Sequence, residues 1–89
     1  IDSKTLETWI DSKIALARAL WTAHENQNAK DQLNKILDDD LGTINQKALS
    51  AWILGSIDIE EKNLNAALVN FKKALTYNST DINNLENIQ

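Results

Sequence analysis

Small and large apolar residues follow one another in a fixed order along residues 48–81, and this order constrains the fold more than any other feature of the chain. Gly55 is followed twelve residues later by Ala67, and Phe71 and Ala74 continue the series at steps of four and three residues. Such steps place side chains on one face of an α-helix. The small residues Gly55 and Ala67 allow two helices to approach closely beside the larger side chains. The segment therefore predicts two antiparallel helices in close contact.

This segment resembles a tetratricopeptide repeat, a helix–turn–helix unit of about 34 residues. The positions that match the repeat pattern are Leu54, Gly55, Leu64, Ala67, Phe71, Ala74 and Leu75. Three positions depart from it, since Ala51 replaces the usual tryptophan, Asp58 the usual tyrosine and Ser79 the usual proline. Asp58 would place a carboxylate near an apolar seam unless its side chain turned to solvent.

A weaker copy of the same pattern lies 38 residues upstream, over residues 10–43. Its matching positions are Leu16, Ala17, Leu20, Ala29, Leu33, Ile36 and Leu37. The offset exceeds the family period by four residues, and the excess falls in residues 38–42, between the second and third helices. Here Gly42 suits the left-handed position that ends a helix, and Thr43 with Gln46 forms a capping box for the next helix.

The periodicity predicts five helices, and they alternate with short polar breaks. Their expected ranges are 3–25, 28–40, 44–61, 64–77 and 81–88. The third range is apolar on almost every side, as expected of a helix held between two neighbours. The resemblance implies an all-α fold in which antiparallel helix pairs stack as a short right-handed solenoid. We expect residues 1–89 to be one domain, excised from a longer protein, because the chain begins with Ile and contains no Met.

The composition excludes several kinds of partner and chemistry. The net charge of −4 disfavours binding to nucleic acid, which requires clustered Lys and Arg. No apolar run is long enough to cross a bilayer, so we expect no direct membrane insertion. Cysteine is absent, which removes disulfides and thiolate metal sites.

No catalytic or metal-binding constellation is found. His24, the single histidine, falls near a predicted helix end, where it suits the helix dipole or solvent. The acidic run Asp38–Asp40 invites a calcium site, but Gly42 and Leu49 stand where oxygen ligands are needed. There is no nucleophile–base pair and no phosphate loop, so we expect no enzyme activity, no metal and no cofactor.

The three tryptophans, Trp9, Trp21 and Trp52, have a spacing typical of core residues, although the resemblance gives two of them another role. In tetratricopeptide arrays the first helix of each pair lines a concave groove that holds a partner. The groove positions implied here are Ile14, Arg18 and Trp21 in the first unit and Trp52, Ser56 and Ile59 in the second. Apolar platforms beside one cation suit an apolar peptide segment or a carboxylate. The Lys and Asn clamp with which some relatives hold chaperone tails is missing, so that role is not expected.

These observations favour a non-catalytic scaffold module that binds another protein or a peptide. One alternative is a structural spacer or self-association element within a larger repeat protein, and another is a peptide-sensing regulatory domain. Residues Ile82, Leu85 and Ile88 form an apolar stripe on the last predicted helix. Because no companion helix follows in this sequence, we expect that end to fray or to form a weak homodimer.

Overall fold

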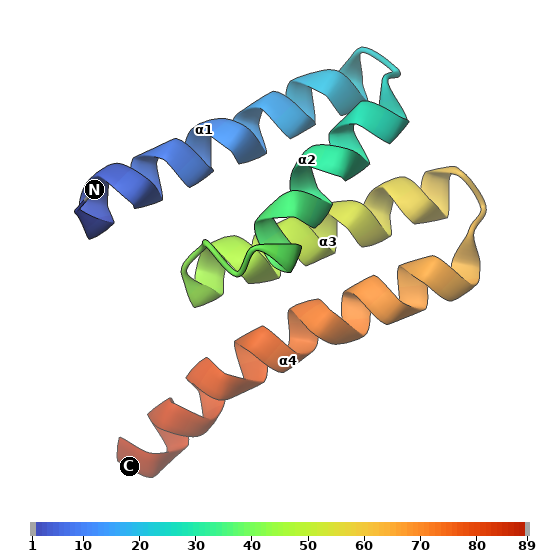
Figure 1. The fold of residues 1–89 in the computed structure, drawn as a ribbon. Coiled ribbons are helices and arrows are strands. Elements are labelled where there is room, and N and C mark those ends of the chain that lie inside the picture. Colours follow the sequence, from blue (N-terminus) through green and yellow to red (C-terminus); the bar gives the residue numbers. More distant parts are fainter. Residues whose placement is uncertain (1, 89) are drawn as a thin grey trace.

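A computed structural model describes the backbone of residues 2–88 and the side chains of residues 2–78. This part of the chain folds into four α-helices and contains no strand (Figure 1). The helices are α1 (Ser3–Thr22), α2 (Asn26–Asp38), α3 (Ile44–Glu60) and α4 (Leu64–Ile88). The prediction of an all-helical chain is therefore confirmed.

The helix count differs from the sequence prediction, because α4 continues through the break expected near residue 79. Ser79 stands where the repeat pattern has proline, so the backbone keeps the N–H group that a continuing helix needs. The fourth and fifth predicted helices are therefore one helix. The stripe of Ile82, Leu85 and Ile88 lies outside the side chains that the structure describes.

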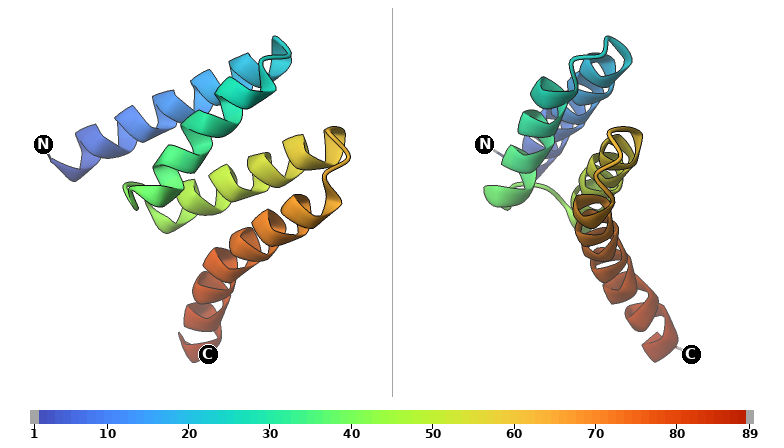
Figure 2. Two further views of the ribbon diagram at one scale, coloured as in Figure 1. Left: turned by 45° about the vertical axis from the view of Figure 1, so that its right-hand side comes forward. Right: turned by 90° about the vertical axis from the view of Figure 1, so that its right-hand side faces the viewer.

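The helices pack in chain order, with α1 against α2, α2 against α3 and α3 against α4. Helices α1 and α3 run in the same direction and also touch, and α1 and α4 lie on opposite outer sides (Figures 1 and 2). One core cluster joins the first three helices, and it consists of Ile10, Ile14, Ala17, Ala29, Leu33, Ile36, Ile53, Leu54 and Ile57. The third helix is thus held between neighbours on both sides, as its apolar sequence predicted.

The seam between α3 and α4 depends on Gly55. A Cβ atom at this position would lie 2.8 Å from Cε1 of Phe71, which is closer than carbon atoms can approach without displacement. Ala67 and Ala74 are each 3% exposed beside the same seam. The ring of Trp52 meets Phe71 edge-on, with 6.2 Å between the ring centroids. The close contact predicted from the small residues is present.

We expect Gly55→Ala to destabilise the fold by about 1 kcal/mol, because overpacking against Phe71 exceeds the gain in helix propensity. In a Phe71→Ala background the ring is gone, and the same substitution should instead stabilise by about 0.5–1 kcal/mol. Urea unfolding of the two single variants and the double variant measures this change of sign. Equal effects of Gly55→Ala in both backgrounds would contradict the contact.

Three helices end in the same kind of turn, in which a non-glycine residue adopts a left-handed conformation. The left-handed residues are His24, Asp40 and Lys62, with φ of 65°, 53° and 63°. At each turn the next residue donates its N–H to a carbonyl five residues earlier, as in Glu25 to Leu20 at 2.8 Å. This hydrogen bonding is the Schellman motif, which glycine usually closes.

Gly42 does not take the left-handed position predicted for it. Helix α2 ends at Asp38, so the left-handed position falls on Asp40 instead. Gly42 lies next to the capping box that was predicted for α3 and is observed there. The Thr43 hydroxyl accepts from the N–H of Gln46, and the Gln46 side chain accepts from the N–H of Thr43.

Glycine at the left-handed positions should stabilise the fold. His24→Gly and Lys62→Gly remove a steric cost of about 1–2 kcal/mol and add about 0.5–1 kcal/mol of chain entropy in the unfolded state. We expect a net gain of about 0.5–1 kcal/mol for each variant in thermal unfolding. The control is Lys72→Gly at an exposed position within α4, which should lose a similar amount. Loss of stability in all three variants would contradict the assignment of the turns.

Candidate functional site

Five of the six residues predicted to line a groove reach the surface, and Ile14 does not. Ile14 is 4% exposed, because α2 and α3 pack around it in the core. Trp52 and Ile59 are 54% and 51% exposed. Arg18 is exposed, and Trp21 and Ser56 are half-buried. Any surface made by these residues therefore lacks the apolar platform expected at Ile14.

Hydrogen bonds join α1 to α3 near both ends of their contact. The indole Nε1–H of Trp21 donates to Oε2 of Glu60 at 2.6 Å. At the other end, Nε2 of Gln46 donates to the carbonyl oxygen of Glu7 and to Oδ1 of Asp11, both at 2.8 Å. Trp21 is therefore part of the connection between the two helices rather than an unused binding platform.

The 38-residue offset identifies an exposed apolar surface on the second helix pair. Side chains of the first helix pair that hydrogen-bond to α3 or to its C-cap residue Glu61 are Asp11, Trp21, Asn26 and Lys30. The residues 38 positions later on α3 and α4 are Leu49, Ile59, Leu64 and Leu68. All four are exposed, from 36% for Leu49 to 68% for Leu64. The second pair thus carries large apolar side chains where the first pair contacts its neighbour.

Two more exposed residues complete this surface. Trp52 lies on the α3 stripe between Leu49 and Ile59, and Leu75 follows Leu68 by seven residues along α4. Phe71 falls between Leu68 and Leu75 on the α4 stripe, and its ring meets that of Trp52 edge-on. We call this surface the C-terminal face, and its residues are Leu49, Trp52, Ile59, Leu64, Leu68 and Leu75.

Sequence reasoning missed the four leucines of this face. The resemblance directed attention to the first helix of each pair, whereas three of the leucines lie on α4. The signal was present in the sequence, because the 38-residue offset between the two copies of the predicted pattern relates Asn26 and Lys30 to Leu64 and Leu68. The sequence does not show that Asn26 and Lys30 face α3, which the structure does.

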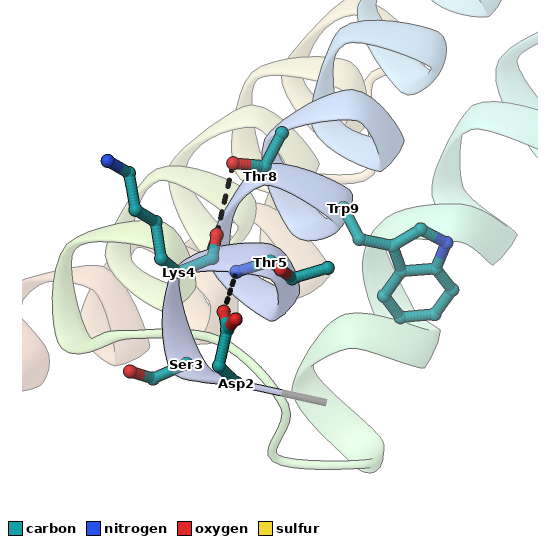
Figure 3. Close-up of a pocket in the computed structure, with 6 residues that line it drawn as sticks. All are labelled: Asp2, Ser3, Lys4, Thr5, Thr8 and Trp9. Atoms are coloured by element: carbon teal, nitrogen blue, oxygen red, sulfur yellow. Dashed lines mark hydrogen bonds between the residues drawn. The ribbon is translucent and has the colours of Figure 1, made fainter.

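The hollow at the start of α1 offers little chemistry (Figure 3). It is lined by Asp2, Ser3, Lys4, Thr5, Thr8 and Trp9. The Asp2 carboxylate accepts from the backbone N–H of Thr5 at 2.7 Å, and this hydrogen bond lowers the pKa of Asp2. The Thr8 hydroxyl donates to the carbonyl oxygen of Lys4 at 3.0 Å. These polar groups form hydrogen bonds with the backbone of the first turns of α1.

The acidic run and the single histidine do not form a metal site in the part of the chain that the structure describes, where no three His, Cys, Asp or Glu side chains cluster. His24 and Asp40 occupy left-handed turn positions. Lys35 pairs with Asp39 at 3.4 Å, and Lys47 pairs with Asp40. Within the acidic run, Asp39 and Asp40 are thus engaged in ion pairs with lysines.

A polar cluster connects α2, α3 and α4 through Asp58, which is buried rather than turned to solvent. Its side chain accepts from Nδ2 of Asn70 at 2.8 Å and lies 4.0 Å from Nζ of Lys30. Lys30 also contacts Glu61 at 2.6 Å, and this hydrogen bond lowers the pKa of Glu61. Satisfied in this way, a carboxylate is tolerated beside the seam.

The Lys30–Glu61 pair should add stability that is lost in acid. Because folding lowers the pKa of Glu61, its contribution is complete above the ordinary value of 4.5 and disappears as the pH falls through the lowered value. A double-mutant cycle of Lys30→Met and Glu61→Gln should give a coupling of about 0.5 kcal/mol near neutral pH, as for other solvent-screened pairs. In urea unfolding at about pH 2.5 the coupling should vanish. A coupling independent of pH would contradict the ion pair.

Comparisons of the chain with protein-family models, with curated proteins and with solved structures found no match. Among the described residues, none of the helices is both long and apolar enough to cross a membrane.

Proposed function

We propose that this chain is a non-catalytic module of tetratricopeptide type that binds an apolar helical segment of another protein through the C-terminal face. The observation that carries the proposal is the exposure of six large apolar side chains on two adjoining helices. Exposed apolar surfaces of this kind usually mark sites of protein association. In tetratricopeptide arrays such helix pairs stack as a right-handed solenoid, and the 38-residue correspondence between the pairs supports this arrangement.

The chemistry of the face favours one class of partner. None of its six side chains carries a charge, so a charged partner side chain would lose its hydration without gaining an ion pair. The face lies on two stripes, as does the surface with which α1 and α2 hold α3. A helix with small or apolar residues along one side is therefore the partner that fits best.

Two groove residues retain a role in this proposal. Trp52 and Ile59 belong to the C-terminal face, and Ser56 lies between them, where its hydroxyl donates to the carbonyl oxygen of Trp52 at 2.9 Å. Arg18 is on the neighbouring helix α1, three residues before Trp21. A structural spacer is the alternative, in which a neighbouring repeat always covers the same face.

Selection of binders from a displayed library of helical peptides of about 16 residues tests the proposal. We expect enriched peptides to carry a small or apolar stripe and to bind at least about tenfold more weakly to Leu68→Lys. The control is Val69→Lys, because Val69 is exposed on the same helix but points away from the stripe of Leu64, Leu68 and Leu75. Both variants lose one exposed apolar side chain and gain one charge. Equal binding to the two variants would contradict the proposal.

A further inference from the structure

The outer side of α1 corresponds to the side of α3 that is held by the first helix pair. On α3 and its C-cap residue, that side contains the core residues Ile53, Leu54 and Ile57 and the polar residues Gln46, Asp58, Glu60 and Glu61, which contact the first pair. The residues 38 positions earlier on and just after α1 are Thr8, Ala15, Leu16, Ala19, Leu20, Thr22 and Ala23. Leu20 is half-buried, and the other six are exposed. We call this surface the N-terminal face.

The two open faces match each other pair by pair. Inside the molecule, Lys30 contacts Asp58 and Glu61. On the open faces, Leu68 takes the place of Lys30, and Leu20 and Ala23 take the places of Asp58 and Glu61. Asn26 contacts Glu61 inside the molecule, and the corresponding open pair is Leu64 with Ala23. Charged or polar groups are thus replaced by apolar groups on both faces at once.

In the remaining pairs an apolar side chain of the C-terminal face corresponds to a threonine of the N-terminal face. The Asp11–Gln46 contact corresponds to Leu49 with Thr8, and the Trp21–Glu60 contact corresponds to Ile59 with Thr22. No open pair places a charge against an apolar side chain. Ala23, the counterpart of both Leu64 and Leu68, would leave room for these larger side chains.

From this correspondence we propose that the C-terminal face of one copy binds α1 of a second copy, in the position that α3 occupies against α1 and α2. The inference rests on the proposed function, since it names the partner of the same face. The contact would continue the α2–α3 interface of the fold across two molecules. Because the two faces differ, each contact leaves one face of each kind free, and short linear oligomers can form.

The N-terminal and C-terminal faces are far enough apart to be used together. Helices α1 and α4 lie on opposite outer sides of the molecule and do not touch within the described residues (Figure 2). A charge on one face therefore leaves the other face intact. This permits a test that separates head-to-tail association from symmetric pairing.

Sedimentation equilibrium from about 10 μM to about 1 mM provides the test. We expect wild-type chain to form dimers and larger species, and Leu68→Lys and Ala19→Lys each to associate at least about tenfold more weakly. An equimolar mixture of these two variants should form dimers that grow no further, because it contains one intact face of each kind. Val69→Lys should behave as wild type, and circular dichroism with thermal unfolding establishes that each variant is folded.

Three results would overturn the inference. The first is a wild-type chain that stays monomeric at the highest concentration. The second is an Ala19→Lys variant that associates as wild type, which would indicate symmetric pairing of C-terminal faces. The third is a mixture of the two variants that remains monomeric. If a monomeric chain still binds library peptides through Leu68, the proposed function holds and the partner is a different protein.

Discussion

The burial of α3 on two sides is the constraint on which the other helices depend. Its residues are apolar around almost the whole circumference, so a stable fold must cover it twice. Helices α1 and α2 cover one side through Ile53, Leu54 and Ile57, and α4 covers the other at Gly55. Because Gly55 has no side chain, α4 approaches closely enough for Phe71 to lie directly against the backbone of α3. The molecule is consequently a layered series in which each helix meets its sequence neighbours.

Polar contacts determine the register of these layers, since apolar packing alone tolerates sliding. Gln46 is 6% exposed and uses one amide group to cap α3 and to hold α1. Asp58 joins α3 to α4 through Asn70, and Lys30 brings α2 to the same carboxylate. A buried carboxylate without such partners would cost several kcal/mol. The register that satisfies these groups is therefore strongly favoured over its neighbours.

Local features of the fold could be predicted from the sequence, whereas long-range ones could not. Helix periodicity, the Thr43–Gln46 capping box and the approach at Gly55 all depend on residues close in sequence or on side-chain size. Asp58 could not be assigned because its partners Lys30 and Asn70 lie on other helices. The left-handed conformation predicted for Gly42 is wrong because α2 ends two residues earlier than predicted. The left-handed position therefore falls on Asp40.

The candidate site shows the same division. Trp52 and Ile59 are exposed at the positions that the predicted repeat register gives to a binding surface, and their role in binding stays a prediction. Ile14 occupies the equivalent position in the first pair but is buried, since α3 covers it there. The same residue position is thus core in one pair and surface in the other. Whether this position is buried depends on whether another helix packs against it. The periodicity of one helix pair does not show this.

The apolar residues at positions 64 and 68, which correspond to Asn26 and Lys30, have a physical reason in the proposed contact between copies. The connecting turn holds an interface inside one chain together. Such an interface therefore tolerates charged pairs whose net contribution to stability is small. A contact between separate molecules must also overcome the loss of translational and rotational freedom. Apolar burial contributes more per residue than a solvent-screened ion pair does. In the proposed contact, Leu68 of one copy would meet Ala23 of another at the place that corresponds to the Lys30–Glu61 pair within the chain, and this difference favours apolar residues there.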